Sequence, residues 1–209
     1  MMATSQESRW IQAVSGSAEP TDLVPTVMTR EPHGPTRPQK GVRLRSGSDV
    51  LDRLNVDGAP PALWVLGTHG GAGESTISSL LHGSVPASHA WPVRNESAVT
   101  AGADRVLLVC RSNAKGLRSA QAAAIEWSTG DLPLALAGLV ITADAPTKLP
   151  KDLSRLTTIV SGAVPHTWQM PWVEEWRRGL TPDVADLPQR VRAVLSDIQL
   201  HTAAQTPTQ

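Results

Sequence analysis

The segment Gly67-Thr68-His69-Gly70-Gly71-Ala72-Gly73-Glu74-Ser75-Thr76 decides the fold of this chain. An apolar run, Leu63–Leu66, precedes it, and Ile77, Leu80 and Leu81 follow it at the spacing of one helix face. A glycine-rich turn between a strand and a helix is the setting of a phosphate-binding loop. Glycines reach backbone angles that other residues avoid, so successive N–H groups of such a turn can point inward and bind an anion. The segment therefore predicts an anion-binding turn.

Outward from this segment, apolar stretches alternate with amphipathic ones. The predicted strands are Leu63–Leu66, Val106–Cys110, Ala135–Thr142 and Thr157–Val164, with a further short strand around Trp91. The predicted helices are Ser75–Leu81, Gly116–Thr129, Leu149–Leu156 and Pro188–Ile198. Strands that are apolar throughout and are separated by helices indicate a parallel sheet covered on both faces. Right-handed crossovers then give an α/β fold with a doubly wound, mainly parallel sheet.

Ligands of such a sheet bind beyond the carboxyl ends of its strands. Three segments follow predicted strands there: the glycine-rich turn after Leu66, Arg111, and residues 142–144. We expect these segments to meet at one edge of the sheet. At that edge Arg111 has two candidate roles, binding an anion or pairing with Glu74.

The glycine-rich turn resembles the deviant Walker A loop of the ParA and MinD type ATPases, whose pattern is Lys-Gly-Gly-x-Gly-Lys-[Ser/Thr]. The matching positions are Gly70, Gly71, Gly73 and the hydroxyl residue Ser75. His69 and Glu74 stand where that pattern has its two lysines. The resemblance implies a P-loop NTPase-like domain.

A longer stretch, residues 64–179, also resembles an uncharacterised actinobacterial family. That family has a Gly-Gly-Ala-Gly-Glu-Ser-Thr loop, an arginine directly after a buried strand, and a Pro-Trp…Trp-Arg segment. In this chain the three features are Gly70–Thr76, Arg111, and Pro171-Trp172 followed by Trp176-Arg177. The second resemblance supports the fold and implies no activity.

The ParA/MinD resemblance implies that ATP or another nucleotide binds together with magnesium. Carried over position by position, the expected cofactor-binding residues are His69, Gly70, Gly71, Gly73, Glu74, Ser75, Thr76 and Arg111. Ser75 is also the expected magnesium ligand, and the sequence names no catalytic residue.

Departures from the family pattern argue against hydrolysis. Glu74 replaces the lysine that clamps phosphate, and unit charges about 4 Å apart interact by about 4 kcal/mol at an effective dielectric constant of 20. A carboxylate in that place loses an attraction of this order and adds a repulsion. Between His82 and Asp104 no apolar run ends in an aspartate, so the magnesium-holding residue of the family is missing. Thr142 stands roughly where the family often has a base-contacting asparagine.

These departures predict a degenerate, non-hydrolysing binding or assembly module. Family analogy alone links such a module to plasmid or mobile-element maintenance. Two alternatives stay open. The turn could merely join a strand to a helix, with Glu74 compensating the helix dipole. Alternatively, magnesium could bridge Glu74 to phosphate in an active nucleoside-triphosphate hydrolase with a rearranged site.

The composition bounds the class of protein. With 209 residues, 40% of them hydrophobic, the chain suits one domain plus tails. The 19 basic and 19 acidic residues cancel, which gives no general attraction to nucleic acid or anionic membrane. Cys110 is the single cysteine, which fits a cytoplasmic protein. Residues 1–10 show no signal peptide, and no apolar stretch reaches the roughly 18–20 residues of a membrane span.

The sequence predicts four segments. Residues 1–41 are rich in Pro, Ser, Thr and Gln without an apolar period, which predicts a disordered arm. Residues 42–59 form a linker or docking segment, in which Val50, Leu51 and Leu54 share one side of a short helix. Residues 60–198 form the P-loop-like domain, and residues 199–209 a flexible tail.

Trp168, Trp172 and Trp176 recur every four residues near the end of the domain. In a chain without Phe or Tyr this favours a stripe of core residues. The alternative is an exposed surface for a protein partner, with Arg177 and Arg178 as neighbours. A partner is expected on this segment or on the Pro-rich arm, and a third interpretation makes the whole chain a scaffold whose arm recruits partners. The sequence leaves the oligomeric state open.

Overall fold

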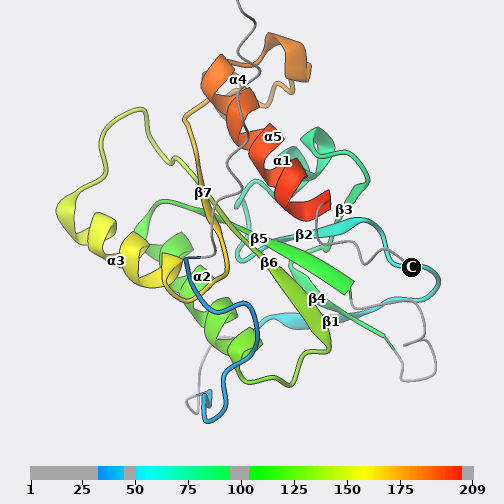
Figure 1. Cartoon of the computed structure of the whole chain (residues 1–209). Coiled ribbons are helices and arrows are strands. Elements are labelled where there is room, and N and C mark those ends of the chain that lie inside the picture. The colour runs from blue at the N-terminus through cyan, green and yellow to red at the C-terminus, as the bar shows by residue number, and fades with distance from the viewer. Residues whose placement is uncertain (1–32, 45–49, 95–103, 204–209) are drawn as a thin grey trace, which may run out of the picture.

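The computed structural model describes residues 33–44, 50–94 and 104–203, which form an α/β domain around a five-stranded parallel sheet (Figure 1). The order of the strands is β3-β2-β5-β6-β7. Their bounds are β2 Leu63–Gly67, β3 Ser84–Pro86, β5 Asp104–Arg111, β6 Leu134–Thr142 and β7 Thr167–Met170. All four neighbouring pairs are parallel, which confirms the predicted doubly wound sheet.

Helices cover both faces of the sheet. The helices are α1 Glu74–Leu80, α2 Ala114–Ser128, α3 Lys151–Ser161, α4 Glu174–Arg177 and α5 Gln189–Ala203, with a short 3-10 helix over Val184–Asp186. Helices α2 and α3 pack on one face, whereas α1 and α5 pack on the other (Figure 1). Successive residues of β5 therefore alternate between two cores: Leu108 and Cys110 face α2, and Leu107 and Val109 face α5.

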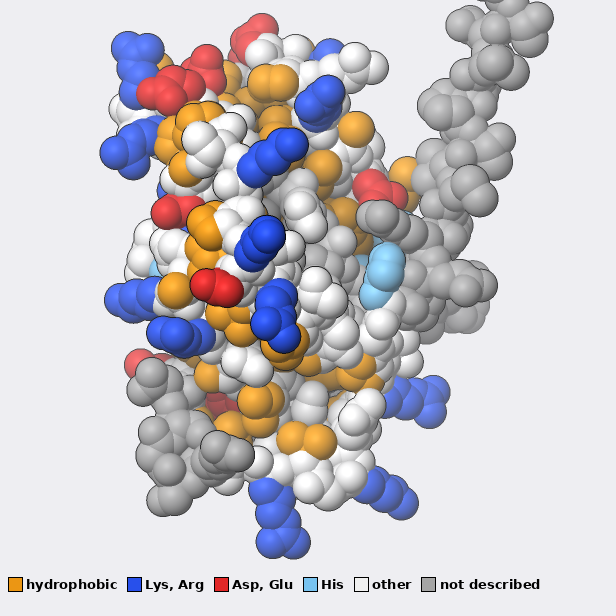
Figure 2. All heavy atoms as spheres, turned by 90° about the vertical axis from the view of Figure 1, so that its left-hand side faces the viewer, with side chains coloured by type: hydrophobic (Ala, Val, Ile, Leu, Met, Phe, Trp, Pro, Cys, Tyr) orange, Lys and Arg blue, Asp and Glu red, His pale blue; other side chains and the backbone are white. Residues whose placement is uncertain are grey.

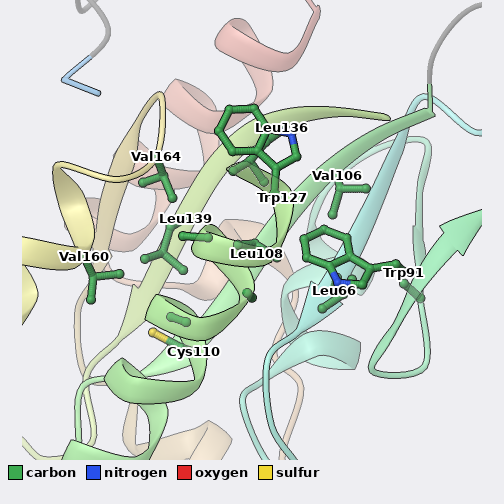
Figure 3. Close-up of a cluster of buried hydrophobic side chains, with 14 of the residues drawn as sticks. Leu66, Trp91, Val106, Leu108, Cys110, Trp127, Leu136, Leu139, Val160 and Val164 are labelled. Carbon is green, nitrogen blue, oxygen red and sulfur yellow. The ribbon is translucent and has the colours of Figure 1, made fainter. Parts of the chain in front are cut away.

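Figure 3 shows the first of these cores. Trp91 and Trp127 supply its two largest fully buried side chains, and they pack around Val106, Leu108 and Leu136. Full burial of one large apolar side chain stabilises a fold by roughly 1.5–3 kcal/mol. With Phe and Tyr absent from the chain, tryptophan fills the aromatic positions of this core.

A second, two-stranded sheet joins β1 Asp52–Asn55 to β4 Ala90–Val93 in parallel. The buried carboxylate of Glu126 on α2 fixes it. Glu126 Oε2 accepts hydrogen bonds from Leu51 N at 3.2 Å and Trp91 Nε1 at 2.9 Å, and Glu126 Oε1 lies 2.7 Å from Arg53 Nη1. The helix predicted around Val50, Leu51 and Leu54 is wrong, because Leu54 pairs as part of strand β1, and Val50 and Leu51, directly before that strand, are not helical.

The strand predicted over Thr157–Val164 is also wrong. Helix α3 continues to Ser161, and the real edge strand, β7, begins six residues later at Thr167. The run of β-branched residues suggests a strand, but within α3 only Thr157 and Val160 are buried, whereas Ile159 is 59% exposed. Burial at a spacing of three is a helical pattern, so packing overrides local propensity.

The predicted segment boundaries also change. Residues 1–32 of the predicted arm lie outside the described residues, but residues 33–41 contact the domain. His33 N donates to Pro165 O at 2.8 Å, and Gln39 N donates to Ser128 O at 3.1 Å. At the other end, α5 runs through Ala203, five residues past the predicted end of the last helix. In the described part of the chain no helix is long and apolar enough to cross a membrane.

The three periodic tryptophans do not form one helical stripe. Trp168 is buried on β7, where its Nε1 donates to Asp197 Oδ2 at 2.8 Å. Trp172 lies in the connection after β7, and Trp176 lies on α4; both are half-buried. The core interpretation therefore holds for Trp168, whereas Trp172 and Trp176 reach the surface at the carboxyl edge of the sheet.

Candidate functional site

The carboxyl ends of β2, β5 and β6 meet at one edge, as the sequence predicts. Arg111 connects them: its Nε donates to Gly71 O and its Nη1 to Ala143 O, each at 3.2 Å. Thr142 Oγ1 donates to Ala72 O at 3.2 Å. Arg111 therefore holds the glycine-rich turn against the end of β6, and the pairing of Arg111 with Glu74 that the sequence left open does not occur.

The glycine-rich turn has the backbone that its sequence predicts. Gly71 and Gly73 have φ angles of 76° and 100°, a region that side chains disfavour. Ala72 N donates to His69 O at 3.1 Å and closes the turn. The N–H groups of Gly70, Gly71 and Gly73 have no hydrogen-bond partner among the described residues. They are backbone donors available to an anion.

His69 is held at both ring nitrogens. Its Nε2 accepts from Arg111 N at 3.2 Å, so Nδ1 carries the proton and donates to Gly70 O at 2.9 Å. Gly116 makes this packing possible, because a Cβ there would lie 2.9 Å from His69 Nε2 and 2.3 Å from Arg111 O. His69 therefore orders the turn, and in this arrangement neither ring nitrogen is free to bind phosphate or to act as a base.

Glu74 points away from the turn and into the sheet. Its side chain is buried, and its carboxylate accepts three backbone N–H groups: Gly67 at 2.7 Å, Ser88 at 2.6 Å and His89 at 3.1 Å. His89 Nδ1 lies 2.9 Å from both Glu74 Oε2 and Gly67 O. We call this set of contacts the Glu74 clamp. It joins the first turn of α1 to the end of β2 and the loop after β3.

The Glu74 clamp changes the role assigned to Glu74. The sequence predicts that the charge of Glu74 lies beside a bound phosphate, but the carboxylate contacts Gly67, Ser88 and His89 instead of the solvent side of the turn. Each hydrogen bond to a charged group contributes about 1.5–3 kcal/mol to stability. Glu74 also lies in the first turn of α1, as the dipole-compensating alternative expected. The role of Glu74 in this fold is therefore structural.

A hollow of about 370 Å³ opens on the other side of the turn. Its polar lining combines the turn with basic side chains from three elements: His69, Gly70, Gly71, Arg111, Asn113, Lys115, Asp144, Trp172, Trp176 and Arg177. Arg111, Lys115 and Arg177 are the Lys and Arg residues of this lining, and Asp144 is its one carboxylate. We call it the basic hollow. On the side of the molecule where β6 leads into α3, Lys and Arg side chains gather in the middle of the surface (Figure 2).

A smaller cavity of about 50 Å³ adjoins the basic hollow and shares Arg111, Trp172, Trp176 and Arg177 with it. It is the more apolar of the two, and Thr76 contributes to its lining. The guanidinium of Arg177 lies 6.0 Å from the centre of the Trp172 ring, within range of a cation–π contact. The two tryptophans and the two arginines thus contribute to the lining of both cavities.

Ser75, the expected magnesium ligand, is exposed and lines neither cavity. The structure does not bring Ser75 and Glu74 together as a metal site, because the oxygens of Glu74 already accept hydrogen bonds within the fold. No group of three or more His, Cys, Asp or Glu side chains suited to a metal ion occurs in the described ranges. The residues present therefore do not fit a magnesium site of the expected kind.

Two basic residues of the hollow were missed from the sequence as ligand-binding candidates. Lys115 lies in the first turn of α2, four residues after Arg111, and Arg177 was noted only as a neighbour of the tryptophans. For Lys115 a signal did exist, because a basic residue in the first turn of a helix opposes the helix dipole. Such a placement is unfavourable for the isolated helix, so Lys115 is a residue that helix stability alone does not explain. Arg177 lies in the last turn of α4 and gives no such signal.

Cys110 ends β5 directly before Arg111 but does not reach the hollow. Burial raises the pKa of its thiol to about 12. A thiol that stays protonated is a poor nucleophile, so Cys110 acts as a small core residue.

Comparison with known proteins places most of the domain in one family. Residues 61–195 match the model of a family described as a family of unknown function (DUF6668). Searches of curated proteins and of solved structures found no match for the chain.

Proposed function

The chain belongs to the family of unknown function DUF6668, and from the geometry of its site we propose that the domain binds a phosphate-bearing ligand without hydrolysing it. One observation carries the proposal. Arg111, Lys115 and Arg177 come from three separate elements and line one hollow beside the donor-rich glycine turn. A nucleotide is the ligand class that we propose.

The charges favour a ligand with more than one negative charge. Three side chains with permanent positive charge face one carboxylate, Asp144, which leaves an excess of two positive charges in the lining. Each exposed pair of opposite charges contributes only about 0.2–1 kcal/mol, but several cations acting on one polyphosphate add up. Backbone N–H groups of Gly70 and Gly71 add neutral donors at the same surface. Tight binding does not require the missing lysine when other cations take its place.

The same geometry argues against hydrolysis. Phosphoryl transfer depends on positioned cations at the transferred group, usually magnesium, and on a group that orients the attacking water. The residues after β3 are Ala87, Ser88 and His89, which add no carboxylate next to the turn. Glu74 is engaged in the clamp, and both ring nitrogens of His69 are bonded. We therefore propose a binding module that works without magnesium.

The relationship to ParA and MinD type P-loop proteins remains part of this proposal. A strand, a glycine-rich turn and a helix in sequence support it, together with the meeting of β2, β5 and β6 at the ligand edge. The proposal also includes an assembly role, a protein partner and a cytoplasmic location. It further includes a place in plasmid or mobile-element maintenance, which rests on analogy alone.

Binding to single-residue variants tests the proposal. ATP and inorganic pyrophosphate are titrated into wild type, Arg177→Ala and Arg178→Ala in a calorimeter. Arg178 is the matched control, because it is an exposed neighbour on the same segment that lines neither cavity. We expect Arg177→Ala to weaken binding about tenfold, or roughly 1.4 kcal/mol, and Arg178→Ala to change it less than threefold. Absence of binding to wild type, or equal effects of the two variants, would reject the proposed site.

A further inference from the structure

Strand β7 lies at one end of the sheet, and its outer side has no strand partner among the described residues. The bonds to β6 show which main-chain groups face outward. Leu139 N donates to His166 O, and Ala143 N donates to Met170 O. The main-chain N–H and C=O groups of the even-numbered residues of β7 therefore point toward β6. Thr167 and Gln169 therefore direct their N–H and C=O groups to the free side, because these directions alternate along a strand. An open edge of this kind is a template for another strand.

A groove of about 580 Å³ runs along this free edge. It lies between α3 and α5, and its lining is His33, Ser161, Thr167, Trp168, Gln169, Ala193, Val194 and Asp197. His33 N donates to Pro165 O at 2.8 Å, on the same outer side. The next residue, Gly34, packs so closely that a Cβ would lie 2.4 Å from Val164 O. The chain before His33 thus starts at one end of the groove.

We propose that residues 27–31 of this chain, which lie outside the described residues, add a sixth strand antiparallel to β7. The contact of His33 with Pro165 sets the register, because antiparallel partners change by one residue in opposite directions. Glu31 then lies opposite Thr167, and Thr29 lies opposite Gln169. This addition pairs the outward main-chain groups of β7.

The sequence before His33 fits this register. The paired positions, residues 27, 29 and 31, are Val, Thr and Glu, all of which have a backbone N–H. Pro32 falls between two paired positions, where a missing N–H is tolerated on an edge strand. Arg30 lies opposite Trp168, on the face where Asp197 accepts the Trp168 indole, so its charge complements that carboxylate.

Disulfide trapping in the full-length chain tests the register. The pair Thr29→Cys with Gln169→Cys should oxidise to an intrachain disulfide, because directly opposite Cα atoms lie about 5.5 Å apart. The control pair, Met28→Cys with Gln169→Cys, places the two thiols on opposite faces of the sheet. Cys110 is buried and does not compete. Equal crosslinking of both pairs, or of neither, would overturn the proposal. Crosslinked dimers would assign the groove to the arm of a second copy instead.

Hydrogen exchange supplies a second measurement without cysteines. The Thr167 and Gln169 amides should exchange at least about tenfold more slowly in the wild-type chain than in Thr29→Pro, which removes one paired N–H. Met28→Pro is the matched control, since the N–H at residue 28 points away from β7 and the protection should persist. Fast exchange of both amides in wild type would show that no strand pairs there. Protection that grows with protein concentration would point to a second copy.

Discussion

The two sides of the glycine-rich turn differ in the sign of their charged side chains and in how many hydrogen-bond partners those side chains have within the fold. On the sheet side, Glu74 is 5% exposed, and its carboxylate accepts hydrogen bonds from the backbone N–H groups of Gly67, Ser88 and His89. On the solvent side, Arg111, Lys115 and Arg177 surround a hollow in which Asp144 is the single carboxylate of the lining. The oxygens of the acid accept hydrogen bonds within the fold, whereas the basic side chains of the hollow outnumber the single carboxylate of its lining. The first side is suited to stability and the second to binding.

Stability and ligand binding therefore depend on different residues in this chain. Glu74 serves stability, and in our proposal the basic side chains of the hollow take the binding role that a lysine at position 74 would have. Removing the clamp should change folding and leave the chemistry of the hollow alone, and removing a base should do the reverse. The pair of effects can therefore be measured independently, because stability and ligand affinity are different experiments.

The largest effect is expected for Glu74→Lys. The change leaves buried N–H groups without an acceptor and places a cation beside them. Breaking a buried charged network in this way costs about 3–5 kcal/mol. We expect the free energy of unfolding in urea to fall by that amount, and the exposed control Glu175→Lys to shift it by less than about 0.5 kcal/mol. If Glu74 instead lay beside a bound phosphate, as its position in the sequence predicts, Glu74→Lys would strengthen nucleotide binding in a folded protein. That result would contradict the clamp.

A smaller loss is expected for Gly67→Ala, which tests the packing of the clamp without changing charge. A Cβ at Gly67 would lie 2.8 Å from His89 Nδ1 and 2.9 Å from Glu74 Oε2. Overpacking of this kind costs about 1–3 kcal/mol. Gly70→Ala is the matched control, because nothing lies within 4 Å of its added Cβ. Thermal unfolding of both variants should show a lower melting temperature for Gly67→Ala alone. Equal shifts would mean that the clamp is not tightly packed.

The smallest effect is expected when the salt concentration is raised. Exposed charges are screened over about 10 Å at 0.1 M salt and about 3 Å at 1 M. Affinity of the basic hollow for pyrophosphate should therefore fall about tenfold across this range, whereas the difference in unfolding free energy between wild type and Glu74→Gln should stay nearly constant. If salt reduced the two quantities equally, both sides of the turn would be comparably exposed.

Much of the fold follows from the sequence, because the information is local. The apolar runs of β2, β5 and β6 and the glycines between β2 and α1 predict the parallel sheet and its ligand edge. The helical end of α3 was missed because Thr157 and Val160 are buried by packing that no local pattern reveals. Strand β3 was missed because it has only three residues.

The direction of Glu74 could not be predicted for a related reason. Two of its three donors, Ser88 and His89, lie 14 and 15 residues further along the chain. They reach the carboxylate only because β3 pairs with β2. Likewise, Arg177 joins the hollow because β7 brings the segment after it beside Thr142. Contacts that depend on the order of the strands appear only once that order is known.

Magnesium dependence tests the central claim most directly. ATP is titrated into the full-length chain by calorimetry, first with excess EDTA and then with magnesium, and phosphate release is followed in the same samples. We predict that magnesium tightens binding by no more than about threefold, or roughly 0.7 kcal/mol, and that no phosphate is released above background. Binding that requires magnesium, together with turnover that Ser75→Ala abolishes, would contradict the account and identify an active hydrolase with a rearranged site.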